Sequence, residues 1–519
     1  MSLSLLIWLP AAVALLAAFF PARMAPRIVF AGSLVVLARA IIYVADFDTG
    51  KAGLQFVTDK IWIAELGIHY KLGLDGLNLF LVLTTTLLFA AALLAANLRD
   101  WERPRLFYFM FALAESGVIG AFCAQDLALF VAFFDLMLIP FYFLIGAWGG
   151  RDRVRATTKL VIYTLVGSLF MLAGAVATGV IAAQGDAPLS FALSDLAAAN
   201  LSKGTQEWIF LCFAAAFLVK MPLFPVHGWM PDGYRAMPLP VVAVFSAVLS
   251  KVAAYGFLRI VLPLYPDASV HFQELLLLIA LASILYGSVM AFTQTDTRLI
   301  IGFSSVAQLG FITLGIFSLR PAGAQGALIQ MVNHAVVVVP LFLIVGALAA
   351  RAGGSENIRD MGGIAFRAPV LAALFLIVAF ANLAMPGSAN FVGEFYILLG
   401  VFQAKLVIAI VAFTGVVLAS VYTLRVFIRA MHNRPSEKVE SRELSFADGL
   451  TIAPLVLVIV ALAVYPQFPL ARSERDVRAA VRPAQLIANP PAPAAAAAPA
   501  LPAQPQAPVQ PAPAQGGTP

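Results

Sequence analysis

Near its middle the chain reads Ala214-Ala215-Ala216-Phe217-Leu218-Val219-Lys220-Met221-Pro222-Leu223-Phe224-Pro225. Lys220 is a single cation inside a run that is otherwise as apolar as a lipid-solvated helix. A charge at the bilayer centre costs about 2.5–3.5 kcal/mol on insertion scales, so such side chains face protein or a water-filled cavity. The two prolines lack the N–H that continues a helix, and broken helix at membrane depth is tolerated only in protein or beside a cavity. The stretch therefore predicts a buried site for ion or proton transfer.

The composition of the whole chain agrees with a lipid environment. Of its 519 residues, 61% are hydrophobic and 12% are charged, against about 25% charged in soluble domains. The formal charge of +6 falls in predicted loops and tail, which indicates membrane topology rather than nucleic-acid binding. Cys123 and Cys212 are far apart in apolar runs and fit neither a metal motif nor a disulfide framework. We expect no metal and no cofactor in this chain.

Hydrophobic segments predict an all-α polytopic membrane protein. A spanning helix needs about 20 mainly apolar residues, and we predict about fourteen spans on that basis. They are residues 3–20, 28–45, 77–97, 107–123, 126–148, 157–184, 207–226, 238–262, 274–292, 299–318, 325–349, 370–399, 404–430 and 449–466. The first lacks a charged leader and is expected to remain as a membrane helix. Segment 189–200 is too short to span and is expected at the interface.

The breaks in these spans suggest an internal repeat. Segment 370–399 is interrupted by Met385-Pro386-Gly387-Ser388, just as segment 207–226 is interrupted after Lys220. Each broken helix is the fourth of five, in blocks 107–262 and 274–430, and paired breaks of this kind indicate an inverted-repeat transporter. Residues 1–106 then hold three N-terminal helices and 449–470 the last helix. The Ala/Pro-rich tail 471–519 is predicted to be disordered, because it cannot bury enough apolar surface.

Basic residues in short loops predict the orientation. Lys and Arg gather in loops one, three, five, eleven and thirteen, which include Arg99, Arg151 and Arg351, whereas loops four and six carry Asp126 and Asp195. Basic loops stay in the cytoplasm. We therefore expect a multi-pass protein of a bacterial inner (cell) membrane with both termini on the non-cytoplasmic side.

Two carboxylates lie on either side of one short turn. Glu115 precedes the turn at Ala124-Gln125 and Asp135 follows it, at similar depth if each residue adds about 1.5 Å of helix. If neighbouring helices bring them together, one of them holds or relays a proton. The alternative for each is a structural role in a buried hydrogen-bond network. An Asp135–Lys220 pair would be a two-state device that holds the lysine charged only while paired.

Four more polar residues extend this series along the chain. Lys251 is a second lysine deep in a span, and Glu394 follows the second break, where the alternative is a cap on the half-helix. His334 is expected to link Lys251 to Glu394, since imidazole both donates and accepts protons; a structural hydrogen bond is its alternative. His227, just after the first break, is a candidate for an entry route near the cytoplasm.

Several of these stretches resemble a known family. Val219–Asp232, Leu249–Gly256 and Phe134–Ile145 look like the antiporter-like membrane subunits of respiratory complex I. Met385-Pro386-Gly387 and Phe391-Val392-Gly393-Glu394-Phe395 resemble the chain M branch, where the second broken helix carries glutamate rather than lysine. The resemblance covers roughly residues 70–470. It implies a fourteen-helix, proton-translocating subunit of an NADH-quinone oxidoreductase.

The resemblance also implies roles and partners. The family's fifth-helix acid corresponds to Asp135, its broken-helix lysine to Lys220, its eighth-helix lysine to Lys251 and its sixth-helix lysine to Lys159; the family histidine and distal glutamate correspond to His334 and Glu394. Sister antiporter-like chains and the lipid bilayer are the implied partners, and no nucleic acid is expected. The family places NADH, quinone, flavin and iron–sulfur clusters in or on other subunits, so the chain has no catalytic centre of its own.

This sequence departs from the family pattern at three places. Asp135 stands where glutamate is usual and is one methylene shorter, so that pairing with Lys220 needs a water. Gln308 replaces a tenth-helix histidine and does not titrate, and Pro231–Pro238 differs at a stretch near the entry. Two other readings remain: a subunit of a cation/proton antiporter or membrane-bound hydrogenase complex, and a structural scaffold, which would not need charges in four or five separate spans.

Overall fold

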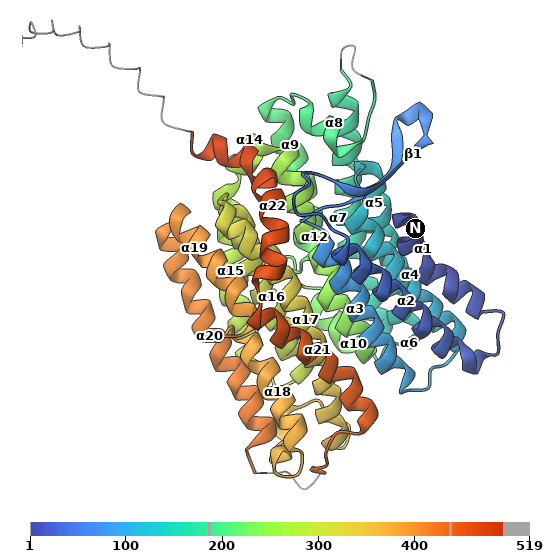
Figure 1. Cartoon of the computed structure of the whole chain (residues 1–519). Coiled ribbons are helices and arrows are strands. Elements are labelled where there is room, and N and C mark those ends of the chain that lie inside the picture. The colour runs from blue at the N-terminus through green and yellow to red at the C-terminus, as the bar shows by residue number, and fades with distance from the viewer. Residues whose placement is uncertain (1, 185–187, 435–438, 491–519) are drawn as a thin grey trace, which may run out of the picture.

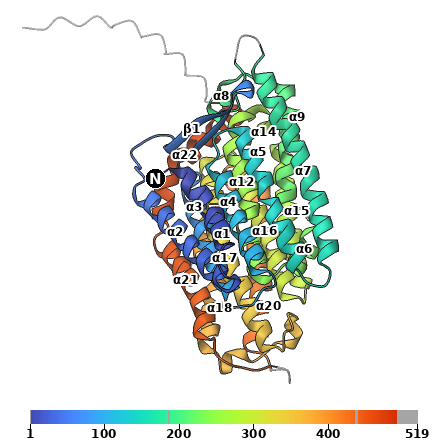
Figure 2. The same ribbon diagram turned by 90° about the vertical axis from the view of Figure 1, so that its right-hand side faces the viewer.

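Long apolar helices run side by side through most of the molecule, with a small β-hairpin at one end (Figures 1 and 2). The computed structural model describes residues 2–184, 188–434 and 439–490. In those residues, eleven helices are long and apolar enough to cross a membrane, and three shorter helices are also apolar. A polytopic helical membrane protein is therefore confirmed, whereas the number of fourteen spans stays a prediction.

The helices follow the predicted order. The N-terminal part holds α1 (Leu3–Ala17), η1 (Ala22–Met24), α2 (Ala25–Ala45) and α3 (Leu79–Asn97). The first block holds α4 (Pro104–Cys123), α5 (Leu127–Leu136), α6 (Leu138–Trp148), α7 (Arg153–Ala182), α8 (Leu193–Ala198), α9 (Lys203–Lys220), α10 (Met230–Ala236), α11 (Leu239–Val244), η3 (Phe245–Leu249), α12 (Ser250–Gly256), η4 (Phe257–Val261) and α13 (Leu262–Leu264).

The second block and the C-terminal part are also helical. They hold α14 (Pro266–His271), α15 (Gln273–Thr293), α16 (Thr297–Phe317), α17 (Pro321–Arg351), η5 (Ile358–Asp360), η6 (Ile364–Phe366), α18 (Pro369–Asn382), α19 (Ala389–Ala404), α20 (Leu406–Met431), α21 (Phe446–Val464) and α22 (Gln467–Ala488). Both predicted breaks occur: α9 ends at Lys220, and residues 383–388 separate α18 from α19. Predicted spans 126–148 and 238–262 are each one helical path made of several segments.

The two blocks share a detail at their second helices. Asp126 caps α5 by accepting from the backbone N–H of Leu129, and Asp296 caps α16 by accepting from that of Leu299, at 3.0 and 3.2 Å. Such side-chain caps satisfy N–H groups that the helix cannot pair. Each cap residue also forms an isolated antiparallel bridge to the segment that precedes its block's broken helix, at Ala192 and Asn357. The matched contacts agree with two related five-helix blocks.

The hairpin was not predicted from the sequence. Strands β1 (Gln55–Ile63) and β2 (Ile68–Leu74) pair antiparallel in the region expected to be the second loop. The turn uses Gly67 at φ 60°, a left-handed conformation that suits glycine. The hairpin lies over the start of α5, because the backbone N–H of Gln125 donates to the backbone oxygen of Lys71 at 2.9 Å.

The predicted disordered tail begins too early. Residues 467–488 form helix α22, so disorder from residue 471 is wrong as far as Ala488; residues 491–519 lie outside the described part of the chain. Val477 and Val481 are fully buried on this helix, which packs against α17, α13 and α14. One apolar stripe on a helix is enough to hold it against a bundle.

The most buried helices form the centre of the bundle. The path from Leu239 to Leu264 is buried except at the partly exposed Arg259 and Pro263, helix α16 is entirely buried, and α17 is nearly so. Helix α17 packs closely on α19, where a side chain on Gly326 would meet the backbone nitrogen of Ile397 at 2.5 Å. Small residues at such contacts are typical of membrane helices. Lys251, Gln308 and His334 all lie in this centre.

Candidate functional site

Lys220 is buried at the end of helix α9, where the first broken helix begins. Its ammonium donates to the backbone oxygen of Phe134 at 2.5 Å and lies 3.4 Å from the centre of that residue's ring. The side chain is 2% exposed. The carbonyl end of a helix and an aromatic face both favour a cation. Lys220 is thus a buried cation, held by Phe134 at the point where helix α9 ends.

Asp135 lies beside this charge without pairing with it. The carboxylate accepts a short hydrogen bond from Ser168 on α7, whereas Lys220 is bonded to the neighbouring residue, Phe134. The described residues therefore contain no direct Asp135–Lys220 pair in this state. Aspartate lacks the methylene of the glutamate that is usual in the family, so its carboxylate reaches less far from the backbone.

Lys251 and His334 are in direct contact. The ammonium of Lys251 lies 2.9 Å from Nδ1 of His334 and donates to the backbone oxygen of Ser246 at 3.1 Å. Lys251 lies on α12 between the π-helical segments η3 and η4, and such wide turns recur at functional sites. The Nε2 atom of His334 is buried with no partner among the described residues. The predicted link from Lys251 to His334 is therefore present.

Glu394 is held by an amide chain rather than by His334. Gln330 of α17 donates to Gln308 of α16 at 2.7 Å, and Gln308 donates to Oε1 of Glu394 on α19, also at 2.7 Å. Oε2 of Glu394 is buried with no partner in the described part of the chain. Since Gln330 precedes His334 by about one helical turn, the imidazole and the carboxylate both lie beside the same stretch of α17. No direct bond joins these two groups in the described residues.

Glu115 is the most isolated of the predicted acids. It is fully buried on α4, and neither carboxylate oxygen has a partner in the described residues. Helix α4 does pack on the segment that carries Asp135, because Gly117 and Gly120 lie against Met137 and Phe133. Neighbouring helices are thus confirmed, while a contact between the two carboxylates is absent from this arrangement. A buried carboxylate without a partner is costly, which makes Glu115 a candidate proton holder.

Lys159 and His227 lie near the first break. Lys159 of α7 pairs with Asp232 of α10 at 2.9 Å, and both side chains are about one-third exposed. His227 is 8% exposed and packs among the rings of Phe224 and Tyr286. These positions suit the predicted entry region, since a partly exposed ion pair precedes a buried imidazole.

Comparison with known proteins identifies the family. The model described as NADH:quinone oxidoreductase/Mrp antiporter, TM, matches residues 124–419. The chain belongs to this family. It is 36% identical over 457 residues to NADH-quinone oxidoreductase subunit M of Rhodobacter capsulatus, with 86% of this chain and 88% of the relative covered. The Escherichia coli K12 subunit M is 38% identical over 430 residues, covering 81% and 84%.

Solved structures agree with that assignment. A chain of respiratory complex I from Thermus thermophilus superposes with a TM-score of 0.85 at 30% identity, covering 93% of this chain and 99% of that one. A chain of the Mrp complex from Dietzia sp. DQ12-45-1b gives 0.80 at 21% identity, with 93% and 98% covered, which shows the shared fold. The resemblance to antiporter-like complex I subunits is thereby confirmed, as is the multi-pass membrane character.

Sequence reasoning missed several neighbours of the site in this family member. Ser168, Gln330 and the backbone oxygen of Phe134 hold the charged residues directly. Gln330 is detectable in retrospect, because it lies one helical turn before His334 on a buried span. The contact with Phe134 has no signal in the sequence, since every residue has a backbone oxygen. Among the described residues, no group of three or more His, Cys, Asp or Glu side chains is placed to hold a metal ion.

Proposed function

We propose that this chain is a proton-translocating membrane subunit of an NADH:quinone oxidoreductase, of the subunit M type. The supporting observation is the contact between Lys251 and His334, two protonatable nitrogens 2.9 Å apart in the buried centre. A charged ammonium gives its proton to Nδ1, and the imidazole then releases a different proton from Nε2. One transfer leaves the proton of His334 on Nδ1, so the imidazole must return to its Nε2–H form before it accepts the next proton from Lys251.

Glu394 is proposed as the receiver of that proton. Its Oε1 is occupied by Gln308, so Oε2 is the oxygen left to accept. His334 and Glu394 are not bonded to each other, and a glutamine does not titrate. The step between them passes through water, and Gln308 positions the carboxylate without carrying the proton.

Lys220 and Asp135 are proposed as the control point of this relay. Asp135 has two possible partners nearby, Ser168 in this structure and the ammonium of Lys220 next to Phe134. A shift of the carboxylate from Ser168 to Lys220, through one water, holds the lysine charged; the reverse shift favours release of its proton. Lys159 and His227 would admit protons and Glu115 would store one.

The energy for this cycle is proposed to come from partner subunits. Those subunits would bind NADH, quinone, flavin and iron–sulfur clusters, and sister antiporter-like chains would flank this one in a bacterial inner membrane, with both described ends on the non-cytoplasmic side. This chain then contributes no redox centre. The cation/proton antiporter remains the second candidate, on the fold shared with the Mrp complex. Purification of the assembled complex with an NADH-oxidising arm supports the first proposal and excludes the second.

The relay is tested by His334→Gln in the assembled complex. Glutamine still accepts from Lys251 but passes no proton. NADH-driven proton uptake into inverted vesicles, normalised to assembled complex, should therefore fall about 100-fold, the lower end of the range for general acid–base groups. His432→Gln, at the exposed end of α20, is the matched control and should pump normally. Unchanged uptake in an assembled His334→Gln complex would overturn the relay.

A further inference from the structure

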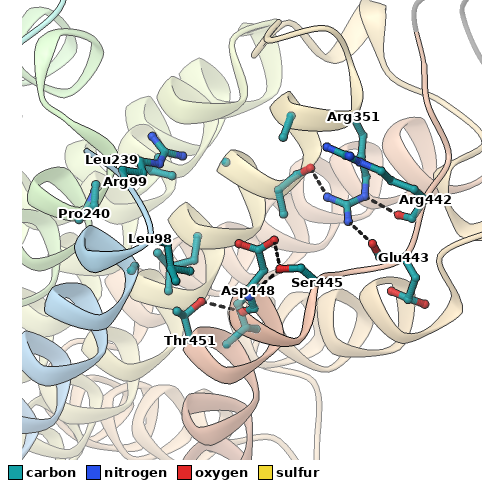
Figure 3. A pocket seen from close by; sticks show the side chains of 16 residues that line it. Leu98, Arg99, Leu239, Pro240, Arg351, Arg442, Glu443, Ser445, Asp448 and Thr451 are labelled. Atoms are coloured by element: carbon teal, nitrogen blue, oxygen red, sulfur yellow. Dashed lines mark hydrogen bonds between the residues drawn. The ribbon is translucent and has the colours of Figure 1, made fainter. Parts of the chain in front are cut away.

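A pocket of about 290 Å³ lies at one end of the bundle and contains none of the residues of the proton relay (Figure 3). The residues that line this pocket come from the ends of α3 and α17 and from the beginnings of α11 and α21. The flanking basic loops are those that the sequence predicts in the cytoplasm. Helix ends of this kind lie at the membrane surface, where phospholipid headgroups are found.

Two of the charged residues around the pocket are already satisfied. Arg351 donates to the backbone oxygens of Ala347, Arg442 and Glu443 at 2.6, 2.6 and 2.8 Å. The carboxylate of Glu443 accepts from the backbone N–H groups at the start of α18. Both charges therefore build the wall of the pocket rather than face a ligand.

Three other charged side chains remain available to a ligand. Arg99 and Arg442 line the pocket, and neither side chain has a hydrogen bond or ion pair to another described residue. A terminal nitrogen of Arg99 lies 3.7 Å from where a side chain on Gly346 would begin, so the guanidinium lies along α17. Asp448 accepts from Ser445 with one carboxylate oxygen, at 2.7 Å, and has the other free for a donor. Figure 3 shows this carboxylate between the two arginines.

An apolar strip continues from the pocket along the membrane face. Leu98 is 43% exposed beside it, and on α21 the outward residues Leu450, Leu457 and Val460 are also exposed. Their spacing places them on one side of that helix. A ligand with a charged end in the pocket thus has an apolar path for a hydrocarbon chain.

We propose that this pocket binds a glycerophospholipid whose headgroup ends in a hydrogen-bond donor, an ethanolamine or a glycerol. The phosphate oxygens accept from Arg99 and Arg442, because guanidinium groups bind phosphate with paired donors, and basic pockets at cytoplasmic helix ends hold lipid headgroups. The terminal ammonium or hydroxyl donates to Asp448. The acyl chains lie along Leu450 and Leu457 of α21.

Photolabelling of the assembled complex tests this site. The complex is placed in lipid nanodiscs with phosphatidylethanolamine that carries a diazirine in one acyl chain, and label on peptides from α21 is measured by mass spectrometry. The double variant Arg99→Gln/Arg442→Gln should lose labelling about tenfold or more, as each basic group contributes to anion binding. The matched control Arg103→Gln/Arg434→Gln removes two exposed arginines outside the pocket and should label like the unaltered protein.

The headgroup donor is tested separately with a phosphatidylcholine probe, which has no N–H or O–H to donate. It should label α21 several-fold less than the ethanolamine probe, and Asp448→Asn should reduce that preference. Equal labelling in the double arginine variant, or equal labelling by both probes, would overturn the site. Protection by soluble glycerophosphoethanolamine as strong as by the lipid would show a soluble phosphate ligand instead, which also overturns it. Labelling needs no proton pumping, so its failure is distinct from failure of the proposed function.

Discussion

Gln308→Leu is the perturbation whose size follows most directly from the structure. Leucine has a similar volume, so the main change is the loss of the 2.7 Å bond from Gln308 to Glu394 and of the partner of Gln330. A hydrogen bond to a charged group is worth about 1.5–3 kcal/mol. Glu394 must be ionised to accept each new proton, and this bond stabilises the ionised form. Without the bond the carboxyl holds its proton more tightly, so at about 1.4 kcal/mol per factor of ten the release of each proton from Glu394 should slow roughly 10- to 100-fold.

The assay is NADH-driven proton uptake in inverted membrane vesicles, with NADH oxidation and complex assembly measured on the same preparation. Gln330→Leu removes only a bond between neutral amides, worth about 0.5–1.5 kcal/mol, and should slow uptake a few-fold. Gln325→Leu is the matched control, because Gln325 is buried on the same helix but is bonded to Ser473 of α22. The loss of uptake should therefore be largest for Gln308→Leu, smaller for Gln330→Leu and smallest for Gln325→Leu. Full activity in an assembled Gln308→Leu complex would refute the positioning role.

Two predictions concern packing and pH. Gly326→Ala places a methyl group 2.5 Å from the backbone nitrogen of Ile397 and should destabilise the α17–α19 contact by about 1–3 kcal/mol. The melting temperature of the complex should fall as a result. In the control Gly204→Ala the new methyl group meets no atom within 4 Å, so the melting temperature should stay unchanged. Burial and then the carboxylate of Asp75 raise the pKa of Asp476 on α22 above its usual value. An acid whose pKa is raised on folding binds its proton more tightly when docked, so α22 should be best protected from hydrogen exchange at low pH and less so as pH rises from the ordinary carboxyl pKa through the raised one. Asp476→Asn should remove this pH dependence; an unchanged dependence would show that another group causes it.

The sequence predicted which residues form the site better than it predicted the contacts between them, for a physical reason. A charge in an apolar span is conspicuous because lipid excludes it, so Lys220, Lys251 and Glu394 are recognisable from residue type alone. The partner of each charge depends on how helices far apart in sequence pack. Asp135 was expected to face Lys220 and is bonded instead to Ser168 on α7, a contact that residue type alone does not reveal.

In the fold, too, features set by individual residues in the chain were predicted better than features that depend on tertiary packing. Proline and glycine placed both helix breaks correctly, because they act on the backbone where they occur. Helix α22 was missed because the Ala/Pro-rich composition of the tail was extended over residues 471–488, although Val477, Val481 and Ala484 repeat at helical spacing. The hairpin β1–β2 was missed because residues 55–74 lie between two predicted spans and were treated only as a loop, although they pair as antiparallel strands.

The most direct test of the central claim is proton uptake by a Lys220→Ala complex. The ammonium of Lys220 is buried against Phe134 at the end of α9, and the proposed mechanism makes its charge the control point of the relay. NADH-driven uptake per assembled complex should be largely lost, while Lys203→Ala, at the exposed start of the same helix, should retain it. Normal uptake in an assembled Lys220→Ala complex would contradict the proposed mechanism.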